Sequence, residues 1–258
     1  MPYPLRMIQI NMAGDRPLYY QETLESVLQA LQANPLFSAE TWGLDERSNK
    51  PYEESKILLV ANGKSSPFVL QLRRKKKIQH TTTIRLSNRP GVIVNVPPNT
   101  PSQDWFNIFE LGDSLASAYQ PDIAWIHLFA DLELPFSDEH QKTQFIMDSG
   151  VVGSGSNYDD DGPGGLGIRT YIGPRLIEIF GRDLLLNTPA SVTEMNWGGV
   201  RIDLVEEPWS ASQVALVSAW KVAMEHLRQA EVFSEVDIDE DDYVYFTRGR
   251  RFTTGARK

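Results

Sequence analysis

Residues 56–96 contain four short β-like runs in succession, and this feature limits the possible folds more than any other. The runs are KILLVA (56–61), FVLQLRRKKK (68–77), TTTIRL (81–86) and GVIVNV (91–96). A turn signal, NRPG at 88–91, separates the last two runs. Strands joined by such short connections pair antiparallel, because a parallel pair needs a crossover of about a dozen residues or more. This stretch therefore predicts an antiparallel sheet.

The segments around these runs predict helices and further strands. In the first part of the chain we expect a strand (6–13), a helix that begins at Pro17, a loop (35–55) and, after the four runs, a helix capped by Ser102. In the second part we expect strands at 121–130 and 168–173, a helix that begins at Pro174, a hairpin turning at Gly198-Gly199 and a last helix capped by Ser210.

This order predicts an α+β fold with mainly antiparallel sheets and helices packed on one face. Each part begins with a strand and ends on a capped helix, which allows two pseudo-repeated halves, 1–120 and 121–258. We expect both halves to belong to one domain, 1–258.

Composition limits the classes of function. The chain has a formal net charge of −9, which disfavours binding to nucleic acid and favours a cationic partner. It has no cysteine, which excludes disulfides, thiolate metal sites and a cysteine nucleophile. The sequence shows neither a signal peptide nor an apolar run of the roughly 20 residues that a membrane span needs. We therefore expect a cytoplasmic protein that does not associate with membranes.

The stretch GSGSNYDDDGPGGLGIRTYIGP (153–174) combines glycines with consecutive aspartates. Its G-x-G-x-x-G spacing follows an acidic loop and precedes a strand, whereas a dinucleotide fingerprint follows a strand and opens a helix. A calcium loop needs oxygen ligands at alternating positions and a later glutamate, which this stretch lacks. Two interpretations stay open: a mobile, solvated loop, or an acidic contact loop formed by Tyr158, Asp159, Asp160 and Asp161.

A second acidic stretch, EVDIDEDDYVYF (235–246), lies near the end of the chain. It is either a solvated tail or a set of carboxylates that mimics a polyanion beside aromatic residues, which are enriched at interface hot spots. Its candidate contact residues are Glu235, Asp237, Asp239, Glu240, Asp241, Asp242 and Tyr243. The basic runs RRKKK (73–77) and RGRR (248–251) are interpreted as solvated edges.

No motif for catalysis or for a cofactor stands out. The four histidines have no metal-ligand spacing, and the G-x-S-x-G elbow of serine hydrolases is absent. The sequence thus predicts no catalytic residue, no metal ligand and no cofactor. Two alternatives to a binding protein stay open: a metal-assisted hydrolase that uses Asp138, His140 and the 159–161 loop, and a non-catalytic scaffold protein of a secretion system.

Three motifs carry a resemblance to a known family. They are LASAYQPDIAWI (115–126), GGLGIRTYIGPRLIEIFG (164–181) and WGGVRIDL (197–204). In this order they resemble bacterial polymorphic-toxin immunity proteins, most closely the immunity protein 52 family and its type VI secretion relatives. The resemblance implies an α+β fold, no enzymatic activity and neutralisation of a cognate toxin, typically a nuclease of the restriction-endonuclease type. It carries over no catalytic residue.

The resemblance and the charge predict the same kind of partner. A nuclease active site attracts phosphates, so its rim is basic, and an acidic protein associates with it faster through electrostatic steering. We expect the two acidic stretches to contact the basic active-site region of the toxin. A homodimer formed through a sheet edge is a further possibility that the sequence leaves open.

Overall fold

The fold is built on one β-sheet, to which both halves of the chain contribute strands of different length. A computed structural model describes residues 5–63, 67–130, 158–159, 162–238 and 244–252. Within these residues, ten strands pair in the order β11-β12-β10-β7-β1-β6-β5-β4-β2-β3, and every described pairing is antiparallel. The predicted α+β class with mainly antiparallel sheet is therefore confirmed.

The first half supplies six strands and the helices beside them. Its elements are β1 (Leu5–Ala13), α1 (Gln21–Ala33), β2 (Thr41–Gly43), β3 (Lys50–Pro51), α2 (Glu54–Asn62), β4 (Phe68–Arg74), β5 (His80–Leu86), β6 (Gly91–Val96), the 3-10 helix η1 (Ser102–Asp104) and α3 (Trp105–Tyr119). Strand β1 lies between β6 and β7, so that Ile10 is opposite Val94 on one side and Ile126 on the other.

The second half adds four strands to the sheet and two small hairpins. Its elements are β7 (Ile123–Ala130), β8 (Tyr158–Asp159), β9 (Gly162–Pro163), β10 (Arg169–Ile172), α5 (Pro174–Phe180), α6 (Arg182–Leu186), β11 (Ser191–Glu194), β12 (Val200–Asp203), α7 (Gln213–Arg228), β13 (Glu235–Ile238) and β14 (Val244–Thr247). Strands β8 and β9 pair only with each other, and so do β13 and β14.

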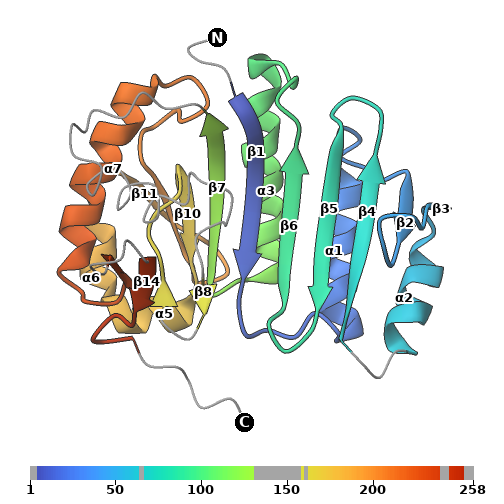
Figure 1. Cartoon of the computed structure of the whole chain (residues 1–258), viewed down its shortest axis with the longest axis horizontal. Helices are drawn as coiled ribbons and strands as arrows, with labels where there is room; N and C mark the ends of the chain where they lie inside the picture. The colour runs from blue at the N-terminus through green and yellow to red at the C-terminus, as the bar shows by residue number, and fades with distance from the viewer. Residues whose placement is uncertain (1–4, 64–66, 131–157, 160–161, 239–243, 253–258) are drawn as a thin grey trace.

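Within each half the helices cover one face of the sheet, and the two halves use opposite faces. The structure has two clusters of buried apolar residues, a first and a second core. Side chains alternate between the two faces of a sheet along a strand, so neighbouring residues of β7 belong to different cores. Ala124 and Ile126 pack with α1 and α3 in the first core. Ile123 and Trp125 pack with α5 and α7 in the second core. Figure 1 shows α1 and α3 behind the strands of the first half, with α5, α6 and α7 gathered at the other end of the sheet.

Five sequence-based predictions of local structure are wrong. Ser102 does not cap the helix that follows it: it begins the 3-10 helix η1, and α3 starts at Trp105 without a side-chain cap. Residues 56–61 belong to helix α2, because Ile57 and Ala61 are buried at helical spacing. The first helix begins at Gln21, four residues after Pro17, and the carbonyl of Tyr20 accepts its first hydrogen bonds. The expected loop 35–55 contains strands β2 and β3.

The fifth wrong prediction concerns the cap of the last helix. The Ser212 hydroxyl accepts a hydrogen bond from the amide of Ala215, 3.3 Å away, and thereby caps α7. Ser210 lies in the preceding turn, where its hydroxyl donates to the carbonyl of Glu207. The predicted start of α5 at Pro174 and the hairpin with Gly198 are confirmed.

None of the helices in the described part of the chain combines the length and the apolar character that a membrane crossing requires. The assignment of residues 1–258 to a single domain stays a prediction.

Candidate functional site

The two acidic stretches singled out in the sequence are each built on a two-stranded hairpin. In the first hairpin Asp159 is opposite Gly162. In the second, Ile238 is opposite Val244. Each acidic stretch therefore supplies at least one strand of a two-stranded hairpin, and residues 160–161 and 239–243 lie outside the described part of the chain.

The bases of the two hairpins are joined. The amide of Ser234, next to β13, donates a hydrogen bond of 2.9 Å to the carbonyl of Pro163 in β9. Gly162 adopts a φ of +104°, and a side chain there would come within 2.9 Å of the Val232 carbonyl. Glycine is therefore required for this close approach. Segments about 70 residues apart in sequence thus lie side by side, since Ser234 and Pro163 are 71 positions apart.

Of the predicted contact residues, the structure places four. Glu235 is exposed at the start of β13, while Tyr158, Asp159 and Asp237 lie in the paired strands of the two hairpins. The others lie outside the described residues: Asp160, Asp161, Asp239, Glu240, Asp241, Asp242 and Tyr243. Asp138 and His140, the candidate hydrolase residues, also lie outside them.

The glycine-rich part of the first acidic stretch is buried. Residues 162–167 are all buried, which contradicts the mobile, solvated loop for this part of the stretch. Two indoles hold it: Trp125 donates to the carbonyl of Gly165 at 2.8 Å, and Trp220 donates to that of Leu166 at 3.0 Å. The amide of Gly167 donates to the Thr170 hydroxyl at 2.9 Å. These glycines allow the backbone to pack closely between β7 and α7, and they anchor the hairpin that precedes them.

A network of charged side chains connects helix α3 of the first half with β10 and β12 of the second. The Arg169 guanidinium donates to Asp203 at 2.5 Å and to Asp113 at 3.2 Å. The hydroxyl of Tyr171 donates to Asp113 at 2.7 Å. Arg201 also donates to Asp113, at 3.0 Å, and its Nε lies 3.0 Å from an oxygen of Asp203. Four of these five residues belong to the R-T-Y and R-I-D motifs that carried the family resemblance.

Most of this network is inaccessible to solvent. The side chain of Arg169 is 5% exposed and that of Asp203 only 2%, whereas Asp113 is 30% exposed. Burial raises the pKa of the Asp203 carboxyl, and the guanidinium of Arg169 beside it acts in the opposite direction. Arg169 also donates to the carbonyl of Phe109 at 3.1 Å and stacks over the Phe109 ring. We interpret the network as a structural connection between the halves.

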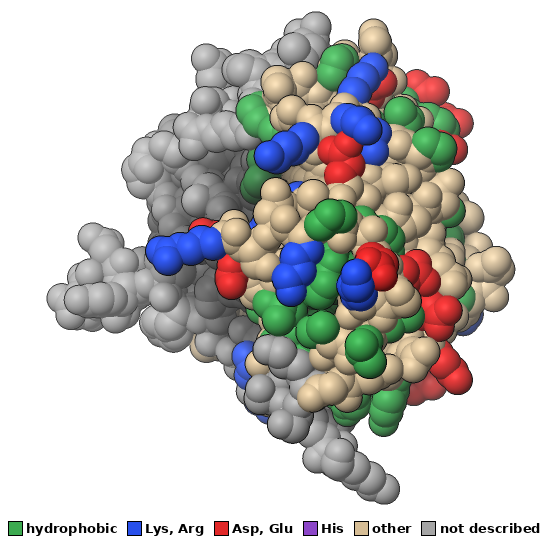
Figure 2. All heavy atoms as spheres, turned by 90° about the vertical axis from the view of Figure 1, so that its right-hand side faces the viewer, with side chains coloured by type: hydrophobic (Ala, Val, Ile, Leu, Met, Phe, Trp, Pro, Cys, Tyr) green, Lys and Arg blue, Asp and Glu red, His purple; other side chains and the backbone are tan. Residues whose placement is uncertain are grey.

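Charge is distributed unequally along the chain. Residues 1–120 contain 13 Lys and Arg against 11 Asp and Glu, a balance of +2. Residues 121–258 contain 12 against 23, a balance of −11. The negative charge of the protein therefore belongs to the half that carries both acidic hairpins. At the other end of the molecule, around α2 and β3, acidic and basic side chains are interspersed (Figure 2).

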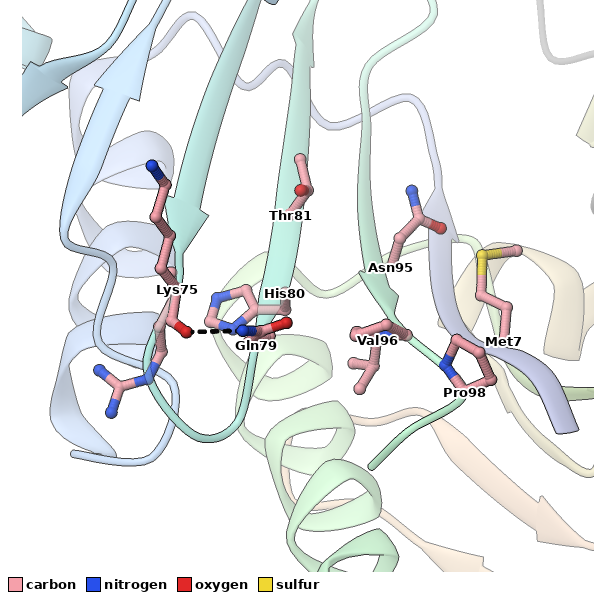
Figure 3. A pocket seen from close by; sticks show the side chains of 10 residues that line it. Met7, Lys75, Gln79, His80, Thr81, Asn95, Val96 and Pro98 are labelled. Atoms are coloured by element: carbon pink, nitrogen blue, oxygen red, sulfur yellow. Dashed lines mark hydrogen bonds between the residues drawn. The ribbon is translucent and has the colours of Figure 1, made fainter. Parts of the chain in front are cut away.

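No potential metal site of three or more His, Asp or Glu side chains occurs within the described ranges. One hollow of about 410 Å³ lies by the β4–β5 turn and the end of β6, and its lining includes Lys75, His80 and Asn95 (Figure 3). The sequence interpretation assigned the basic run of this turn to a solvated edge and missed the hollow. Only the lack of acidic residues beside the run could have indicated it.

Comparison with known proteins identifies the fold. No model of a protein family matches the chain, and no curated protein matches it. Among solved structures the chain is similar to the Pseudomonas aeruginosa T6SS (type VI secretion system) protein PA0821. The TM-score is 0.53 at 10% sequence identity, and the match covers 87% of this chain and 84% of the other. The similarity at this identity shows a shared fold over most of both chains.

Proposed function

We propose that this protein is an immunity protein of the type VI secretion system, which binds a cognate secreted toxin and neutralises it. In this proposal the toxin is a nuclease of the restriction-endonuclease type, and the protein itself catalyses no reaction. The observation that carries the proposal is the joining of the two acidic hairpins by the hydrogen bond between Ser234 and Pro163. It supports the proposal because Pro163 and Ser234, which adjoin the two predicted contact stretches in the sequence, lie side by side.

The charge distribution supports a cationic partner. The balance of −11 in residues 121–258 is concentrated in the half that carries the hairpins. Complementary charge raises the association rate toward ~10⁸–10⁹ M⁻¹s⁻¹ at low salt. A nuclease presents the required positive charge, because its active site attracts phosphates. The similarity to a T6SS protein is consistent with the secretion system in which such toxin pairs operate.

Charge alone does not produce the affinity that protection requires. Neutralising a lethal enzyme needs a Kd on the order of nanomolar, or about 12 kcal/mol. Aromatic anchors at the centre of an interface supply most of such energy. In the proposed interface Tyr158 and Tyr243 take this role beside the carboxylates. The buried residues 162–167, which Trp125 and Trp220 hold by hydrogen bonds to the carbonyls of Gly165 and Leu166, support the base of the first hairpin.

The decisive experiment co-expresses the protein with the toxin encoded beside it and measures survival and co-purification. We expect rescue of growth and a stable complex. If the toxin kills the cells despite a folded, expressed partner, the proposal is wrong. If the two proteins co-purify without rescue, the protein is a scaffold of the secretion system. If the purified protein turns over a substrate, it is an enzyme, as in the metal-assisted alternative with Asp138 and His140.

A kinetic experiment tests the proposed interface. The triple variant D159N/D160N/D161N should slow association with the toxin by about tenfold at low salt and flatten its salt dependence. The matched control is E22Q/E46Q/E110Q, which removes the same charge from exposed positions of the first half. Equal slowing by the two variants would show that net charge alone acts and would remove the first hairpin from the interface.

A further inference from the structure

The hollow by the β4–β5 turn combines a cationic wall with an apolar one. It has a volume of about 410 Å³, within the range of about 300–1,000 Å³ that is typical of small-molecule sites. Basic and polar side chains (Arg74, Lys75, Gln79, His80, Thr81 and Asn95) line one part, and Met7, Val96, Pro97 and Pro98 line the rest. No acidic side chain is among these residues, although the protein carries a net charge of −9.

One of the two positive charges of this wall, that of Arg74, is fixed in place by carbonyl groups. The Arg74 guanidinium donates to the carbonyl of Lys77 at 2.7 Å and to that of Ser38 at 2.8 Å. These contacts hold the side chain without neutralising its charge. Beside it, the backbone carbonyl of Lys75 accepts a hydrogen bond of 2.9 Å from the Gln79 amide, as Figure 3 shows. The Arg74 guanidinium and the backbone of the turn are therefore preorganised, which reduces the entropic cost of binding an anion.

The other two lysines of the same turn are already paired. Lys76 lies 3.1 Å from Glu40, and Lys77 lies 2.9 Å from Asp104. The amides of Lys75 and Lys76 also donate to Glu40, and these hydrogen bonds lower the pKa of its carboxyl to about 2. Two carboxylates thus balance the two lysines that do not line the hollow. The positive charges of Arg74 and Lys75 can therefore attract an anion in the hollow.

The lining also contains one buried polar atom. His80 is only 4% exposed, and its Nδ1 lies 3.2 Å from the carbonyl of Ile78. That contact fixes the orientation of the ring. The Nε2 atom is buried and has no hydrogen-bond partner within the described residues. A buried polar atom without a partner costs free energy. Because Nδ1 donates to the Ile78 carbonyl, Nε2 is an acceptor in the neutral ring, so it does not contact a phosphate oxygen and stays available to a donor such as a water.

We propose that this hollow binds a small phosphate monoester with an apolar or aromatic body. The phosphate contacts Arg74 and Lys75, whose two positive charges match its charge of about −2 at neutral pH. The body packs against Met7, Val96 and Pro97. This site is in the first half and acts without the toxin, so the proposal does not depend on the proposed immunity function.

Three probes separate the contributions of charge and apolar body. Phenyl phosphate has both parts, inorganic phosphate has only the charge, and benzyl alcohol has only the body. Titration followed by NMR should give a Kd on the order of 1 mM or tighter for phenyl phosphate, with the largest shifts at the amides of Thr81 and Asn95. Inorganic phosphate should bind more weakly at the same amides, and benzyl alcohol more weakly still. No shift with phenyl phosphate, or shifts confined to other regions, would overturn the proposal.

The turn itself offers a matched pair of variants. Lys75→Gln should weaken phenyl phosphate about five- to tenfold, because Lys75 lines the hollow. Lys76→Gln removes the same charge one residue away, where Glu40 already pairs with it, and should leave the affinity nearly unchanged. Thermal unfolding of both variants checks that each is folded. An equal loss in both would mean that the turn attracts anions without a site, and it would refute the proposal.

Discussion

The two halves of the molecule contribute antiparallel strands to one sheet but differ in charge. In the first half the last strand, β6, pairs with the first, β1, whereas in the second half the last strand of the sheet, β12, pairs with β10, and β10 lies beside β7. Yet residues 1–120 have a charge balance of +2 and residues 121–258 one of −11. One continuous sheet therefore carries two differently charged halves, because exposed side chains set the surface charge while buried apolar ones form the cores.

The halves also differ in which face their helices cover. Helices α1 and α3 cover one face of the sheet, and α5 and α7 cover the other. Strands β7 and β10 take part in both arrangements, with Tyr171 in the first core and Ile172 in the second. The centre of the sheet is therefore covered on both sides. The charged network of Arg169, Asp113 and Asp203 lies at this centre and connects the halves directly.

Breaking that network should have the largest effect on stability. Arg169→Ala leaves Asp203 buried with only Arg201 beside it, and it removes the contacts to helix α3. We expect the free energy of unfolding in urea to fall by about 3–5 kcal/mol, the typical cost of removing one partner of a buried ion pair. If the two halves unfold as one unit, the fluorescence and circular dichroism transitions of the variant still coincide.

An exposed ion pair of the second half is the control. Arg182 pairs with Glu194, and both side chains are about half exposed, at 49% and 56%. Arg182→Ala should cost less than about 1 kcal/mol, because solvent screens such pairs. A loss for Arg169→Ala as small as that of the control would show that the network does not hold the halves together.

The sequence predicted the strands well where apolar and polar residues alternate and a turn signal follows. Strand β6 and the hairpin at Gly198 are such cases. It failed at residues 56–61, because a short apolar run fits a helix as well as a strand and only the packing of Ile57 and Ala61 decides between them. The charge network could not be predicted, because its partners are up to 88 positions apart, as Arg201 and Asp113 are.

The candidate site was predicted in part for the same reason. Both acidic stretches are visible in the composition, but their joining through Ser234 and Pro163 depends on contacts between distant segments. The basic hollow was missed, because its lining comes from four strands (β1, β4, β5 and β6) and the segments that follow β4 and β6. Sequence patterns report local structure and charge, whereas tertiary packing determines which residues meet.

Acidification should affect the second half more than the first. Burial lowers the pKa of His127, in β7, to about 4. Burial also lowers the pKa of His80, in β5, but the hydrogen bond to the Ile78 carbonyl opposes this. A depressed pKa stabilises the folded state above the unfolded value of about 6.5, and this contribution is lost as the pH falls from 6.5 toward 4. Between pH 7 and 5 the contribution of His127 should decrease by about 2 kcal/mol.

Urea unfolding at both pH values measures this effect. The difference between pH 7 and 5 should shrink by about 2 kcal/mol in His127→Gln, and by less in His80→Gln. A pH dependence that is unchanged in His127→Gln would mean that the imidazole is not held neutral in the folded protein. A larger change in His80→Gln would reverse the expected order of the halves.

The smallest expected effect concerns the cap of helix α7, which covers only the second core. Ser212→Ala removes the hydroxyl that accepts from the Ala215 amide, and it should lower stability by about 1 kcal/mol. Hydrogen exchange should speed up at the first turn of α7 and not in α1, which packs in the other core. Ser210→Ala is the matched control, since its hydroxyl only contacts Glu207 within the preceding turn. Faster exchange in α1 of the Ser212 variant would show that the two cores loosen together, so that the separation into two differently covered halves would not extend to their dynamics.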